Sequence, residues 1–211
     1  SIKSTQLSLK EKRILKNEKP WGLILFKRNI KSLGQIRNLV KKIRKLTKDS
    51  KFPILIDEEG ATVSRLSKII SHDLSQKFFG DIYKINADIT LVLYKYYIKE
   101  LTAVLKKIGI NINTVPVLDV LRKNTSEIIG DRSFSNDPQV VKQLGQECIK
   151  QYELNKIATV IKHIPGHGCA SIDSHKKLPK VKAKYKDLNK IDFLPFKSNT
   201  SKFAMTAHIL Y

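Results

Sequence analysis

The stretch IATVIKHIPGHG, residues 157–168, opens with five apolar or β-branched residues and then becomes polar. An uninterrupted run of this kind is typical of a strand buried on both faces of a parallel sheet. Four further runs with the same character occupy residues 21–26, 52–56, 110–115 and 203–209. Each run contains ionisable residues at its carboxyl end or is followed by them.

Helical patterns separate these strand-like runs, and several carry recognisable start or stop signals. Serine, asparagine and aspartate are favoured at helix starts, and glycine at helix ends. The expected helices begin at Ser8 (with Glu11), Ser32 (with Gln35), residue 86 and Asp137-Pro138, a weaker one covers residues 187–197, and Gly109 ends the third.

Buried parallel strands that alternate with helices predict an α/β fold. Polar residues at the carboxyl ends of all the strands favour a barrel, because a (β/α) barrel builds its active site on that rim. No glycine-rich phosphate motif follows the first strand, which disfavours nucleotide-binding doubly wound folds. We therefore predict a single domain over residues 1–211, an incomplete (β/α)8 TIM-type barrel with about five of its eight strands.

The chain carries 40 Lys and Arg against 19 Asp and Glu, a formal net charge of +21. Only seven of the basic residues are Arg, and most Lys occupy the polar faces of predicted helices. Base recognition favours Arg, and single-strand binding favours interleaved aromatics, so nucleic acid is not an expected partner. One cluster adjoins the histidine-rich segment and could attract anions: Lys176, Lys177, Lys180, Lys182, Lys184 and Lys186.

The apolar runs are too short to cross a bilayer, so we expect no membrane partner. The two cysteines provide no disulfide framework, and no leader sequence opens the chain. These features favour a cytoplasmic location.

Three of the five histidines lie within thirteen residues, at His163, His167 and His175. The first two have the spacing of helical zinc ligands, but an intervening proline and glycine prevent a helical turn. Cys169 could be a nucleophile, although no thiolate-stabilising setting is evident. Asp173 and His175 could instead form an acid/base dyad, since residues two apart in an extended loop project to the same side. An exposed loop without a catalytic role fits the spacing equally well.

The segment from Lys162 through Asp173-Ser-His175 resembles the Lys-His-Phe-Pro-Gly-His-Gly…Asp-Ser-His motif of family 3 glycoside hydrolases. Within that family it is most similar to the bacterial cytoplasmic β-N-acetylglucosaminidases of peptidoglycan recycling. Five further stretches match in the family's order: WGLILFKRN (21–29), IDEEG (56–60) with Arg65, PVLDV (116–120), IGDRSF (129–134) and AMTAH (204–208).

This resemblance implies a (β/α)8 barrel and a retaining hydrolysis that needs no cofactor or metal. His175 would be the acid/base and Asp173 its orienting partner. The implied substrates are N-acetylglucosaminyl-anhydromuropeptides. The residues implied to bind the sugar and its substituents are Asp57, Arg65, Arg132, Lys162 and His163.

The sequence departs from the family pattern at two points. Gly60 is followed by Ala61 and Thr62 where the family has Gly and Arg, so a positive φ at Ala61 would be strained. The family's nucleophilic Asp, in a Ser-Asp-x-Leu-x-Met segment, has no counterpart before Tyr211. We therefore expect a chain shortened at both ends, mainly the carboxyl end, that is inactive alone and whose open sheet edges could bind a companion polypeptide.

Two other functions remain open on the sequence. A non-catalytic remnant would bind N-acetylglucosamine through Asp57 and Arg132 without hydrolysis. A Lys-driven nucleic-acid binder would show a steep, sequence-independent salt dependence.

Overall fold

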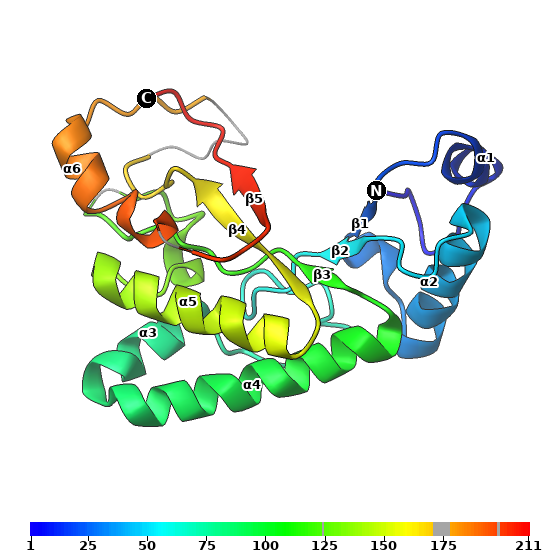
Figure 1. The fold of residues 1–211 in the computed structure, drawn as a ribbon, viewed down its shortest axis with the longest axis horizontal. Coiled ribbons are helices and arrows are strands. Elements are labelled where there is room, and N and C mark those ends of the chain that lie inside the picture. The colour runs from blue at the N-terminus through cyan, green and yellow to red at the C-terminus, as the bar shows by residue number, and fades with distance from the viewer. Residues whose placement is uncertain (124, 171–177, 198) are drawn as a thin grey trace.

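A computed structural model of the chain describes residues 1–211 apart from 124, 171–177 and 198. Five parallel strands form one sheet in the order β1-β2-β3-β4-β5, an open half-barrel that confirms the predicted partial (β/α) barrel (Figure 1). The strands are β1 (Leu23–Leu25), β2 (Ile54–Ile56), β3 (Ile112–Asn113), β4 (Ala158–Ile164) and β5 (Phe203–Thr206).

Consecutive strands pair in parallel, so their carboxyl ends lie along one edge of the sheet. Asn113 of β3 is in register with both Ile56 of β2 and Thr159 of β4. The pairing of β4 with β5 shifts register between Lys162 and Ile164. The polar residues that follow β2, β3 and β4 are therefore neighbours in space although they are distant in sequence.

Helices cover the sheet, with α1 and α2 at its β1 end and α4 running lengthwise beside α3 and α5 (Figure 1). Among the helices of the described residues, none combines the length and apolarity needed to cross a membrane. The α-helices are α1 (Leu9–Asn17), α2 (Leu33–Thr47), α3 (Gln76–Ile85), α4 (Ala87–Ile108), α5 (Pro138–Leu154) and α6 (Tyr185–Lys190).

The predicted helix ends are confirmed by the capping contacts. The Ser8 hydroxyl accepts from the amide of Glu11, and the Glu11 carboxylate accepts in return from the amide of Ser8. The side chain of Asn86 caps α4, and Gly109 ends that helix with a φ of 85°. Asp137 caps α5 directly before Pro138.

The structure differs from the sequence-based expectation at three places. Helix α3 was not predicted. The helix expected over residues 187–197 is divided into α6 and a 3-10 turn, Leu194–Phe196. The strand expected over residues 157–161 continues to Ile164, so that Lys162 and His163 belong to β4 itself.

An aromatic cluster joins α3 and α4 to the segment that leads to α5. Phe79 and Tyr94 lie with ring centroids 4.5 Å apart, and Tyr94 contacts Phe134 edge-on at 5.9 Å. All three are buried. Gly80 lets α3 approach closely, because a Cβ at this position would lie 1.7 Å from the carbonyl oxygen of Phe134. The helix thereby fixes the position of the segment around Arg132.

We predict that Gly80→Ala destabilises the 211-residue chain by about 1–3 kcal/mol, the usual range for inserting a methyl group into a closely packed contact. Urea unfolding monitored by circular dichroism measures this loss. The control is Gly34→Ala in α2, where nothing lies within 4 Å of the added Cβ. This control should leave stability unchanged or raise it by up to about 1 kcal/mol. Equal stability of the two variants would contradict the packing of α3 on Phe134.

Candidate active site

The ends of the central strands bring together most of the polar residues singled out in the sequence. Asp57 follows β2 directly, while Lys162 and His163 lie within β4. Arg132 ends the 3-10 turn Gly130–Arg132, and Arg65 lies in the long segment between β2 and α3. These five residues occupy a common rim at the carboxyl end of the half-barrel. Asp173 and His175 lie outside the described residues.

A buried carboxylate, Glu59, holds two of the predicted cations in place. Arg132 donates to it through Nε at 2.7 Å and through Nη2 at 3.0 Å. The ammonium group of Lys162 approaches the same carboxylate at 2.5 Å. The side chains of Glu59 and Lys162 are each 3% exposed, so this contact is shielded from water. Such a two-pronged arginine–carboxylate contact fixes orientation as well as distance.

Asp57 extends this arrangement toward solvent. Its carboxylate pairs with Arg65 at 3.2 Å and lies 3.5 Å from the ammonium group of Lys162. The hydroxyl of Thr114 donates to Asp57 and accepts from Lys162 at 3.0 Å. Asp57, Arg65, Arg132 and Lys162 are thus joined into one network, with Glu59 and Thr114 as the connecting groups.

The charges of the network determine its protonation states. Burial alone would raise the pKa of both Asp57 and Glu59, but the neighbouring cations, Lys162 foremost, bring each pKa below its usual value. Burial would lower the pKa of Arg132, yet the contact with Glu59 raises it above its usual value. The carboxylates and the guanidinium group are therefore ionised at neutral pH.

Glu58 organises the segment that carries Arg65. Its buried carboxylate accepts from the amides of Arg65 and Leu66, each at 2.8 Å. The Nε2 atom of His72 lies 2.8 Å from the other oxygen, and the Tyr97 hydroxyl lies 3.2 Å from His72 Nδ1. This chain of contacts anchors the segment to α4 and so positions Arg65 beside Asp57.

His163 is held by a second buried carboxylate, Asp119. The Nδ1 atom of His163 lies 2.7 Å from Asp119 Oδ2, and the amide of His167 donates to Oδ1 at 2.7 Å. Burial would raise the pKa of Asp119, but His163 and the amide of His167 bring it below its usual value. An ionised carboxylate therefore sets the orientation of the His163 ring.

A cavity of about 360 Å³ adjoins this part of the rim. This volume lies within the range of small-molecule sites. Its polar lining includes Arg132, which Glu59 holds, and His163, which Asp119 holds. The carboxylate network and the Asp119–His163 pair therefore adjoin the same cavity. The full lining is Ile128, Ile129, Arg132, His163, His167, Met205, Thr206, Ala207 and His208.

Not every strand end contributes to this site. After β1, Asn29 is buried and donates to the carbonyls of Ile2 and Ser4, while Arg28 donates to Ile2. These residues anchor the amino-terminal segment. In the lysine cluster, Lys176 and Lys177 lie outside the described residues, and the others (Lys180, Lys182, Lys184 and Lys186) are exposed.

The alternative chemistries considered from the sequence gain no support in the described residues. Burial raises the pKa of Cys169 to about 11, so its thiol is protonated at neutral pH and a poor nucleophile. Within the described residues, no group of three or more His, Cys, Asp or Glu side chains could hold a metal ion.

Three central residues were not singled out as site residues from the sequence: Glu59, Thr114 and Asp119. Glu59 and Thr114 closely follow β2 and β3, and position after a strand was the signal that could have identified them. Asp119 lies in the quoted PVLDV motif. The sequence shows which residues follow a strand, but it does not show which of them contact one another.

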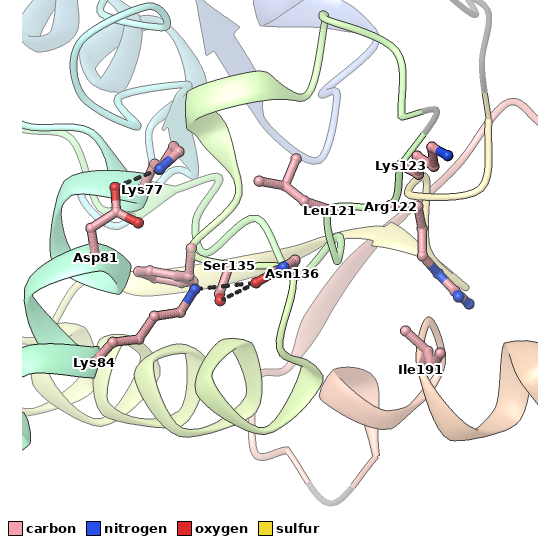
Figure 2. A pocket seen from close by; sticks show the side chains of 10 residues that line it. Lys77, Asp81, Lys84, Leu121, Arg122, Lys123, Ser135, Asn136 and Ile191 are labelled. Atoms are coloured by element: carbon pink, nitrogen blue, oxygen red, sulfur yellow. Dashed lines mark hydrogen bonds and ion pairs between the residues drawn. The ribbon is translucent and has the colours of Figure 1, made fainter.

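A larger cavity, of about 620 Å³, lies elsewhere on the molecule and contains none of the predicted site residues (Figure 2). Most of its cations already have protein partners. Lys77 pairs with Asp81 at 2.5 Å, Arg122 pairs with buried Asp192 at 2.5 Å, and Lys84 donates to an asparagine side chain. The smaller cavity beside the carboxylate network is therefore the better candidate site.

Comparison with known proteins assigns this arrangement to a family. The model of the glycosyl hydrolase family 3 N-terminal domain matches residues 2–211. A beta-hexosaminidase of Thioalkalivibrio sulfidiphilus is 33% identical over 214 residues, which cover 100% of this chain and 60% of that protein. Beta-hexosaminidase A of Pseudoalteromonas piscicida is 34% identical over 202 residues, which cover 90% of this chain and 33% of that protein.

Solved structures show the same likeness. NagZ from Neisseria gonorrhoeae, in complex with N-trifluoroacetyl-D-glucosamine, matches with a TM-score of 0.91 at 29% identity, covering 100% of this chain and 62% of that one. A family 3 β-N-acetylglucosaminidase from Paenibacillus sp. matches with a TM-score of 0.90 at 26% identity, covering 99% and 40%. The chain thus spans less than two thirds of the length of these relatives.

We predict that Glu59→Ala lowers the free energy of unfolding by about 3–5 kcal/mol, because it removes the carboxylate shared by buried Lys162 and largely buried Arg132. Urea unfolding of the 211-residue chain measures the loss. Asp81→Ala is the matched control, since it breaks the exposed Lys77–Asp81 pair, which should contribute at most about 0.5 kcal/mol.

If Glu59→Ala fails to fold, Glu59→Gln provides a second measurement. Glutamine keeps the shape and one acceptor oxygen, so we expect a smaller but clear loss of stability relative to the control. Stabilities of Glu59→Gln and Glu59→Ala within about 0.5 kcal/mol of Asp81→Ala would contradict the buried network.

Proposed function

The chain belongs to glycosyl hydrolase family 3, and on this basis we propose that its protein is a retaining exo-β-N-acetylglucosaminidase. The proposed substrates are anhydromuropeptides of peptidoglycan recycling, from which the enzyme removes N-acetylglucosamine in the cytoplasm. The observation that carries the proposal is the convergence of Asp57, Arg132 and His163 on one polar rim of a half-barrel. The relatives support an N-acetylglucosamine-type sugar as the group that is bound, because one is named a beta-hexosaminidase and another was solved with N-trifluoroacetyl-D-glucosamine. They do not identify the rest of the substrate.

In this proposal the rim residues bind the sugar through different kinds of contact. Asp57 is partly exposed and ionised, so it accepts hydrogen bonds from sugar hydroxyls, and Arg65 beside it donates. Arg132 and His163 line the cavity and supply further polar contacts. Lys162 is almost fully buried, so we assign it an indirect role. Its ammonium group keeps the carboxylates of Asp57 and Glu59 ionised and holds both in position.

We assign the acid/base role to His175 and the orienting role to Asp173, as the family motif implies. A carboxylate attacks the anomeric carbon while His175 protonates the departing glycosidic oxygen, which gives a glycosyl–enzyme ester. His175 then takes a proton from water, and that water displaces the carboxylate to release the sugar. The protein's own groups perform both steps without a cofactor.

The nucleophilic carboxylate is proposed to come from outside the 211 residues. In the family it lies in a Ser-Asp-x-Leu-x-Met segment, which this sequence does not contain. The relatives extend well beyond the matched region. We propose that residues 1–211 form part of a catalytic domain, and that its further strands come from additional chain or from a companion polypeptide that pairs with the sheet edges at β1 and β5.

The alternative function is sugar binding without hydrolysis. It requires the same rim residues but no nucleophile. The two functions make the same demand on Asp57 and Arg132 and differ only in turnover, so binding and hydrolysis are measured separately.

We predict that the 211-residue chain binds N-acetylglucosamine and that Asp57→Asn weakens binding by roughly tenfold or more, since hydrogen bonds to charged groups contribute about 1.5–3 kcal/mol. Titration calorimetry provides the measurement. Asp81→Asn, a surface substitution outside the proposed site, is the control and should bind as the parent chain does. The proposal fails if the folded parent chain shows no affinity or if both variants bind equally well.

We also predict that the 211-residue chain alone does not hydrolyse an aryl β-N-acetylglucosaminide above background, because it lacks the family's nucleophilic segment. Release of the aryl alcohol, followed by absorbance, tests this. Turnover that disappears in His175→Ala would show that a nucleophile lies within the 211 residues and would contradict this expectation.

A further inference from the structure

Asp119 uses both of its carboxylate oxygens on a single short segment of the chain. Oδ1 accepts from the amide of His163 at 3.3 Å and from the amide of His167 at 2.7 Å. Oδ2 lies 2.7 Å from Nδ1 of the His163 ring. The residue is fully buried. One side chain therefore fixes both the backbone around Pro165 and the direction of the His163 imidazole.

The contact between Asp119 and His163 determines which ring nitrogen carries the proton. An ionised carboxylate has only acceptor oxygens, so Nδ1 must be the donor in this hydrogen bond. In the neutral ring, Nε2 is then left as an acceptor. The His163 side chain is 17% exposed and lines the 360 Å³ cavity together with Arg132.

We propose that Asp119 is a positioning residue that holds His163 as its Nδ1–H tautomer, with Nε2 directed into the cavity to accept a hydrogen bond from a sugar hydroxyl. This inference rests on the proposed sugar-binding function and adds the residue that prepares one of its contacts. Arg132, fixed by Glu59, donates only. His163 thus supplies the complementary acceptor in the same cavity.

Asp119 is buried and does not itself line the cavity. The charge of Asp119 is balanced by the backbone amides of His163 and His167 and by the N–H of the His163 ring. The cavity has the His163 ring and the Arg132 cation in its lining.

The tautomer of His163 can be measured directly by NMR on the 211-residue chain labelled with 15N-histidine. At a pH where the rings are neutral, long-range correlations distinguish a protonated Nδ1 from a protonated Nε2. His163→Gln identifies the His163 signals. We expect the Nδ1–H tautomer in the parent chain. An Nε2–H tautomer there would overturn the proposal, whatever the affinity for sugar.

Asp119→Asn tests whether the carboxylate is the cause. The amide NH2 can turn toward Nδ1 and donate to it, so we expect the Nε2–H tautomer to become populated and the affinity for N-acetylglucosamine to fall roughly tenfold. The matched control is Asp81→Asn in α3, an exposed residue outside the proposed site. This control should change neither property. An unchanged tautomer in folded Asp119→Asn would overturn the proposal.

The two readouts separate this inference from the proposed function. If Asp119→Asn shifts the tautomer but binds N-acetylglucosamine as the parent does, the positioning role is wrong and the proposed function stands. If the parent chain is folded and shows the expected tautomer but binds no sugar, the proposed function fails, and the acceptor role proposed for His163 fails with it.

Discussion

The candidate site depends on one interaction, the contact of the buried Glu59 carboxylate with Arg132 and Lys162. The three residues come from three separate parts of the chain, and their contacts join those parts at the rim. Without the carboxylate, buried Lys162 and largely buried Arg132 would repel each other and carry a large desolvation penalty. Because Glu59 balances them, Asp57 is left partly exposed beside a fixed positive charge.

Three consecutive acidic residues follow β2, and each contacts a different set of partners. Asp57 contacts Arg65 and Lys162, and it forms the part of the network nearest to solvent. Glu58 points instead to backbone amides at Arg65 and Leu66, where it holds the following segment. Glu59 pairs with the two cations Arg132 and Lys162. Successive side chains of an extended chain point in opposite directions, which is why neighbouring carboxylates serve different partners.

Local signals in the sequence were sufficient for much of the fold. The capping residues Ser8 and Asp137 and the stop at Gly109 act within a few residues and were predicted correctly. Helix α3 was not predicted; it contains Gly80, a poor helix former, and exposes the apolar side chains of Phe78 and Ile85. The roles of Glu59 and Asp119 depend on contacts 73 and 44 residues away, respectively, and no local pattern encodes such contacts.

We have proposed that the rim held by Glu59 and Asp119 binds the sugar, and not the larger cavity. Amide NMR spectra recorded during titration with N-acetylglucosamine test this residue by residue. We expect chemical shift changes that concentrate around Asp57, Arg132 and His163 and leave the amides of Lys77 and Lys84 unchanged. Chemical shift changes confined to the 620 Å³ cavity lined by Lys77 and Lys84, or no changes in the folded chain, would contradict this assignment.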